Sequence, residues 1–168
     1  MALPEVWLRG PLPNMPVLLQ PVAHALLQAR EEVEAVLVGF PEDRLWSRPG
    51  GVASVGFHLQ HLAGVLDRLF TYARGEALGD EQRAFAKREG DGGEPPAPLR
   101  AVAAESRLLL ERGLEQLRAT APLTLLDGRK VGRAGLPSTV IGLLFHAAEH
   151  ATRHVGQAIT TAKILRGG

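Results

Sequence analysis

The 168-residue chain contains no cysteine, and aromatic residues make up only 5% of it. The absence of cysteine excludes disulfides, thiolate metal ligands and a cysteine nucleophile. A metal bound by this chain must therefore have nitrogen or oxygen ligands. If the protein carries out sulfur chemistry, the sulfur must arrive with a substrate.

The chain also lacks an excess of charge of either sign, because 19 Lys and Arg residues are balanced by 18 Asp and Glu residues. Proteins that bind nucleic acids usually concentrate basic residues on one surface, so we expect no nucleic-acid partner. Charged residues or histidines interrupt the apolar stretches every few positions, which argues against a membrane span. The first residues lack the apolar core of a secretory signal, and we expect a cytoplasmic location.

The length and the hydrophobic content of 45% are typical of one globular domain, which we place over residues 1–168. Apolar residues recur at helical spacing in four long segments, separated by stretches rich in proline and glycine. The expected elements are an extended N-terminal arm over 1–16, long helices over 17–40, 54–75, 98–119 and 137–165, and a short helix over 80–89 followed by a flexible loop. This pattern predicts an all-α fold, an antiparallel four-helix bundle.

Two boundaries carry local signals. Ser54 is a suitable N-cap for the second long helix. The Asp127-Gly128 pair is typical of a tight hairpin turn, so we expect a small hairpin or irregular loop before the last helix. Pro137 and Ser138 are expected to open that helix.

Five of the six histidines lie in two clusters, His58 with His61 and His146 with His150 and His154. Residues three or four positions apart lie on one side of a helix, where their side chains converge. Neutral imidazole is the commonest metal ligand in proteins. The spacing therefore predicts a site for a divalent metal where the two helices meet.

The angular positions narrow the choice on the last helix. At ~100° per residue, His150 and His154 lie at the edge of the apolar stripe, whereas His146 lies on the polar side. His146 and His154 are also about 12 Å apart along the helix axis, too far to share one ion comfortably. The pair His150 and His154 is therefore favoured. On the second helix the residues leave both His58 and His61 open, but they slightly favour His58, which lies nearer the apolar centre.

Two segments resemble the DinB-like family of metal-binding four-helix bundles. The first is His61-Leu62-Ala63-Gly64, and the second is His150-Ala151-Thr152-Arg153-His154-Val155-Gly156-Gln157, which is similar to the family's His-x-x-x-His-x-Gly-Gln signature. The resemblance implies that His61, His150 and His154 bind zinc or nickel. It leaves as candidates for pocket residues, or for residues that support the ligands, a further set: His58, His146, Arg68, Tyr72, Glu149 and Gln157.

Some members of that family transfer thiols to electrophiles. The resemblance thus leads to the hypothesis of a metal-dependent thiol S-transferase that acts on a small-molecule substrate with an exogenous low-molecular-weight thiol. A metal-dependent hydrolase is an alternative, although Asp67 is expected on the polar side of its helix and no obvious general base is near the site. A non-catalytic, metal-stabilised binding or stress-response module is a second alternative. We expect a homodimer.

Overall fold

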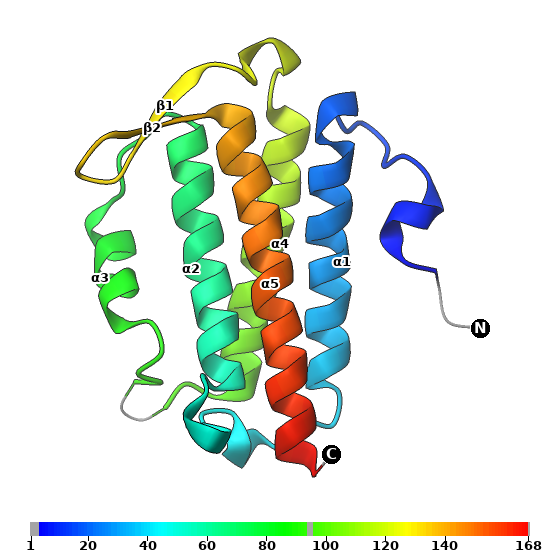
Figure 1. The fold of residues 1–168 in the computed structure, drawn as a ribbon, viewed down its shortest axis with the longest axis vertical. Helices are drawn as coiled ribbons and strands as arrows, with labels where there is room; N and C mark the ends of the chain where they lie inside the picture. Colours follow the sequence, from blue (N-terminus) through cyan, green and yellow to red (C-terminus); the bar gives the residue numbers. More distant parts are fainter. Residues whose placement is uncertain (1–3, 94–95, 168) are drawn as a thin grey trace.

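The computed structural model describes residues 4–93 and 96–167, and most of these residues are helical (Figure 1). The long helices are α1 (Gln20–Leu37), α2 (Val55–Ala73), α4 (Leu99–Ala119) and α5 (Val140–Arg166), and α3 (Asp80–Arg88) is short. Single 3-10 turns occupy Val6–Arg9, Val17–Leu19, Glu42–Arg44, Pro49–Gly51 and Pro122–Thr124, and strands β1 (Gly128–Val131) and β2 (Leu136–Thr139) form one hairpin. The predicted helical fold and the small hairpin are confirmed. No helix in the described part of the chain is long and apolar enough to cross a membrane.

The four long helices surround a common core, in which α5 lies against α1 and α2, and α4 lies against α1 and α2 (Figure 1). In Figure 1, α1 and α5 run downward whereas α2 and α4 run upward. The hydrogen bonds agree, because Ser106 bonds to Leu59 O and Gln116 to Phe70 O, so residue numbers rise together along α2 and α4. The predicted antiparallel order therefore does not hold for every neighbouring pair: α2 and α4 are parallel, as are α1 and α5.

The cause is the segment that connects α2 to α4, which returns along the whole side of α2. At its start, Gln82 of α3 donates to Asp67 and Thr71 near the C-terminal end of α2. At its end, the amide of Gly90 donates to Gln60, much nearer the start of α2. The chain thus enters α4 at the end of the bundle where α2 began, and it carries residue 89 past the first turns of α2. Residues 94 and 95 of the predicted loop, and residues 1–3 of the predicted arm, lie outside the described residues.

Of the two helix starts that the sequence predicts, that of α2 is confirmed and that of α5 lies later in the chain. Ser54 caps α2 as predicted, because its hydroxyl accepts a hydrogen bond from the amide of Phe57. Helix α5 begins after the predicted position: Thr139 is its N-cap, and Pro137 and Ser138 belong to β2.

The hairpin turn also lies elsewhere than predicted. It is formed by residues 132–135, where Gly132 and Gly135 have φ values of 68° and 60°. The Asp127-Gly128 pair precedes the turn, and Gly128 is already paired with Thr139 in the ladder. The amide of Gly135 donates to the carbonyl of Gly132, so these two glycines with positive φ are the ends of the turn, and neither Asp127 nor Gly128 belongs to it.

The core side of α5 combines large and very small side chains. Leu144 and Val155 are fully buried, and so are Ala158 and Ala162. Side chains as small as alanine let neighbouring helices approach closely. The arm packs against α1 through Val6, whose side chain is buried and whose amide donates to Gln28.

Candidate metal centre

Three histidines converge between α2 and α5, and they are the three that the family resemblance implied. One ring nitrogen from each of His61, His150 and His154 lies within 4.8 Å of the others. Nε2 of His61 is 3.1 Å from Nε2 of His150, and the ring centroids of His150 and His154 are 4.5 Å apart. The spacing of four residues places the two α5 rings on one side of the helix, one turn apart.

The two α5 rings are neutral at ordinary pH. Burial, followed by the neighbouring charges of His61 and His146, lowers the pKa of His150 to about 4. Burial, followed by the charges of the surrounding histidines, lowers the pKa of His154 to about 3. Metal ligation requires an unprotonated nitrogen, and these environments supply it.

The hydrogen bonds of His61 and His150 leave ring-nitrogen lone pairs that no protein group donates to. Such lone pairs indicate whether a cation fits between the rings. Nδ1 of His61 is 2.7 Å from a carboxylate oxygen of Glu89, so this nitrogen carries the proton and Nε2 of a neutral ring is an acceptor. If His150 donates to that acceptor from its own Nε2, its Nδ1 becomes a bare lone pair. Within the described residues Nδ1 of His150 is buried and has no hydrogen-bond partner. A divalent cation accepts several imidazole lone pairs at once, and an all-nitrogen donor set suits zinc or nickel.

Glu89 is a further candidate residue of the site, which the sequence did not reveal. Its side chain is only 8% exposed, and its two oxygens are both bound: Oε2 accepts from His61 and Oε1 accepts from Arg68. Burial alone would raise the pKa of Glu89, but the hydrogen bonds from His61 and Arg68 outweigh it and hold the pKa below its usual value. A carboxylate on the second nitrogen of a ligating histidine fixes the ring's tautomer and orientation.

Gly64 makes room for this carboxylate. A Cβ atom at Gly64 would overlap the Glu89 carboxylate and come within 2.6 Å of the Phe85 ring. Since Gly64 has ordinary helical geometry, close approach rather than backbone conformation explains the glycine in His61-Leu62-Ala63-Gly64. The first histidine motif thus contains both a candidate ligand and the space for its carboxylate partner.

His58 lies on the inner side of the triad. It is 5% exposed, and its Nδ1 is 3.1 Å from Nδ1 of His154. Burial, followed by the charge of His61, lowers the pKa of His58. Phe57 stacks on His61 with an interplanar angle of 10°. His58 and Phe57 therefore restrict the orientations of two candidate ligands.

The other pocket or supporting residues expected on α5 lie partly beside the triad and partly on the outer surface of the helix. His146 is exposed and pairs with Glu149, which also accepts from Arg153, so Glu149 is occupied on the surface rather than by a triad imidazole. Gln157 and His58 line a cavity of about 440 Å³ together with Arg153.

Two further candidates lie elsewhere along α2. Arg68 contacts Glu89. Tyr72 lies near the end of α2 and packs against the hydrophobic core.

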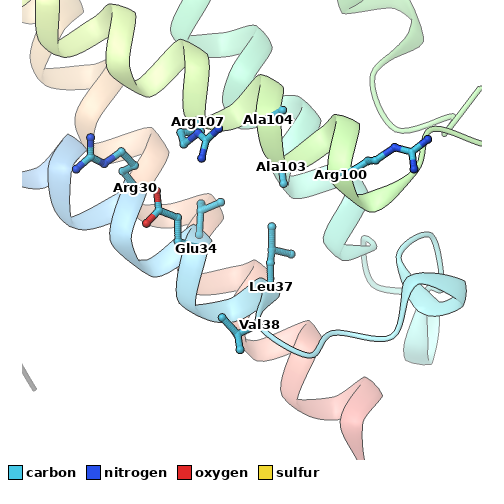
Figure 2. Close-up of a pocket in the computed structure, with 9 residues that line it drawn as sticks. Arg30, Glu34, Leu37, Val38, Arg100, Ala103, Ala104 and Arg107 are labelled. Atoms are coloured by element: carbon cyan, nitrogen blue, oxygen red, sulfur yellow. The ribbon is translucent and has the colours of Figure 1, made fainter.

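Other hollows are distinct from the triad. A cavity of about 270 Å³ lies beside Phe57 and Glu89 and is also lined by Arg48. A groove of about 350 Å³ lies between α1 and α4, the helix pair that does not carry the triad. Figure 2 shows Arg30 and Arg100 at opposite ends of this groove, with guanidinium groups that do not converge on a common point. Among the described residues, the triad is the group of histidines that could hold a metal ion.

Comparison with known families agrees with this site. The model of the DinB superfamily matches residues 25–158, a range that includes both histidine clusters, α3 and Glu89. No curated protein matches the chain.

Proposed function

The chain belongs to the DinB superfamily, and on this premise we propose that it is a metal-dependent transferase that joins an exogenous low-molecular-weight thiol to an electrophilic small molecule. The observation that carries the proposal is the convergence of His61, His150 and His154 from two helices. We propose zinc or nickel as the ion. A divalent ion held by three neutral imidazoles keeps its positive charge and lowers the pKa of a coordinating thiol or water.

The reaction forms a carbon–sulfur bond, and it releases the thiol proton and the leaving group of the electrophile. The chain itself has no cysteine, so the sulfur comes from the thiol substrate. The cavity lined by His58, Arg153 and Gln157 lies directly beside the triad, since His58 contacts His154. These polar side chains give a small polar molecule hydrogen-bonding partners there, and Val52 and Ile164 supply apolar contact.

The state of the carboxylates favours transfer over hydrolysis. A metal-dependent hydrolase usually needs a carboxylate free to take a proton from water. Both oxygens of Glu89 are already bound, by His61 and Arg68, and Asp67 accepts from Gln82 on α3. Glu89 is thus placed to orient His61 rather than to act as a general base.

The first experiment is elemental analysis of the purified protein together with His150→Ala and His154→Ala. We expect about one divalent ion per chain in the wild type and loss of the ion in both variants. His24→Ala is the matched control, because His24 is bound to Gly10 O in the arm and lies outside the triad.

The second experiment measures turnover of metal-loaded protein with glutathione, cysteine or coenzyme A and a fluorogenic haloalkyl electrophile. We expect conjugation that His154→Ala abolishes. Stoichiometric metal without conjugation by any thiol would replace the transferase proposal by a metal-binding module. Absence of metal from the wild type, even after incubation with zinc or nickel, would end the metal proposal as well.

A further inference from the structure

We propose that Glu89 is a positioning residue through which metal binding at the triad stabilises the segment formed by α3 and the turn after it, residues 80–92. The inference rests on the metal-binding part of the proposed function. It adds that this segment is held to α2 more firmly in the metal-bound protein, and that Glu89 in turn strengthens metal binding.

Helix α3 is weakly anchored apart from Glu89. It has nine residues, and none of them is buried. Isolated helices of that length are unstable in water, so its persistence depends on contacts with the rest of the protein. On one side Gln82 reaches Asp67 and Thr71 of α2, and on the other a cavity of about 850 Å³ separates α3 from α4.

Glu89 supplies the buried attachment at the end of α3. Its carboxylate fits over Gly64, accepts from Arg68, and accepts from Nδ1 of His61. The next residue, Gly90, packs against Phe57, because a Cβ there would come within 3.2 Å of the ring at Cε2 and closer at Cδ2. Phe57 itself stacks on His61. Two of the buried contacts at the end of the segment are therefore with His61 and with the residue stacked on it, and a third joins Gly92 to Trp46.

Metal binding changes the strength of one of these contacts. An ion on His61 draws electron density from the ring, which makes the N–H at Nδ1 a stronger donor and fixes the ring in the orientation that faces Glu89. Coupling of this kind is reciprocal, so a carboxylate that is held more firmly when metal is bound must also raise the affinity for metal. Loss of such a carboxylate typically lowers metal affinity about 10–100-fold.

The coupled segment also forms part of the surroundings of the site. Glu89, Gly90 and Asp91 line the cavity of about 270 Å³ beside Phe57, with Arg48 on the other wall. Metal binding therefore holds one wall of this cavity next to the triad more firmly in place.

The test uses the full-length protein and zinc alone. Hydrogen–deuterium exchange of peptides from residues 80–92 is measured with and without zinc, and zinc affinity is measured by competition with a chromogenic chelator. We expect zinc to slow exchange in this segment of the wild type. In Glu89→Gln zinc should leave exchange in the segment unchanged, and the affinity should fall about 10–100-fold.

Glu81→Gln is the matched control, since Glu81 lies on the same helix and is exposed. It should behave as the wild type. The absorption spectrum of the cobalt-substituted protein gives a readout that a purely structural role would not move, because a reoriented His61 alters the ligand field. Arg68→Ala provides a second route to the same contact if Glu89→Gln proves unstable, and it should reduce zinc affinity in the same direction.

The outcomes separate the two proposals. If the wild type binds zinc, and Glu89→Gln binds it equally well with the same zinc-dependent exchange, the coupling is refuted and the metal proposal stands. If the wild type does not bind zinc at all, both are refuted.

Discussion

Replacing Gly64 by alanine should destabilise the protein, although the same change inside an ordinary helix is favourable. Glycine in a helix interior is less stable than alanine by about 1 kcal/mol, because the unfolded chain loses more conformational freedom. Gly64 lies well within α2, so propensity alone predicts a gain for Gly64→Ala. The contacts of Glu89 predict the opposite.

The magnitude follows from what the new methyl group displaces. It would overlap the Glu89 carboxylate and lie 2.6 Å from Phe85 Cε1 and 2.9 Å from Arg68 Nη1. The flexible end of Glu89 can move away only by giving up its hydrogen bonds to Arg68 and His61. Hydrogen bonds to charged groups contribute roughly 1.5–3 kcal/mol each, so the loss of even one exceeds the gain in propensity. For the loss of one of the two bonds we expect a net decrease of about 0.5–2 kcal/mol in the free energy of unfolding.

Urea unfolding followed by circular dichroism measures this difference, with Gly156→Ala as the matched control. Gly156 lies in the interior of α5 and is exposed, and a Cβ added there would have no atom within 4 Å. Gly156→Ala should therefore stabilise the protein by up to about 1 kcal/mol. Equal stabilisation by the two substitutions would show that Glu89 does not pack over Gly64 in solution, and the proposed coupling of α3 to the triad would lose its structural basis.

Four further expectations test the core, the cavity between α3 and α4, and the metal. Ser106→Ala should lower the free energy of unfolding by about 0.5–1.5 kcal/mol in urea titrations, because the buried hydroxyl bonds to the carbonyl of Leu59. Leu144→Ala should lower it by about 2–5 kcal/mol, since Leu144 is fully buried in α5. Burial, followed by the charge of Asp67, raises the pKa of Glu105, so the folded state disfavours its ionised form and wild-type stability falls as the pH rises above the ordinary value of 4.5. Glu105→Gln should therefore be more stable than the wild type at pH 7 and equally stable at pH 4, as measured by unfolding at both values. Removal of bound metal with a chelator should lower the melting temperature in calorimetry, because an ion at 100 times its Kd adds about 2.7 kcal/mol.

The candidate ligands on α5 could be predicted because their placement follows from one helix. The spacing of His150 and His154, and their angle to the apolar stripe, depend only on helical geometry, and the structure brings the two rings together. His146 was excluded by the same geometry and is exposed. Periodicity slightly favoured His58 over His61, whereas it is His61 that lies together with His150 and His154.

The choice between His58 and His61 depends on the neighbouring segments. His58 is turned inward against His154, whereas His61 is turned toward the segment that follows α3. The family resemblance implied His61, whereas helical periodicity carries no information about the neighbouring segments that distinguish the two histidines. The predicted position of the hairpin turn was also wrong. Asp127-Gly128 is a local turn signal, whereas the pairing of Gly128 with Thr139 depends on residues farther along the chain.

The missed carboxylate and the wrong helix direction have one cause. If a short loop joined α2 to α4, the two helices would be antiparallel, and no segment would pass beside His61 on the outside of α2. The parallel arrangement requires the chain to return along α2, and that return carries Glu89 to Nδ1 of His61, 28 residues away in sequence. Periodicity within each helix gives no information about this path. For that reason the sequence predicted neither the Glu89 carboxylate beside His61 nor the parallel arrangement of α2 and α4. It follows that shortening residues 76–98 to a tight loop would remove the carboxylate partner of His61 even if all three candidate ligands were retained.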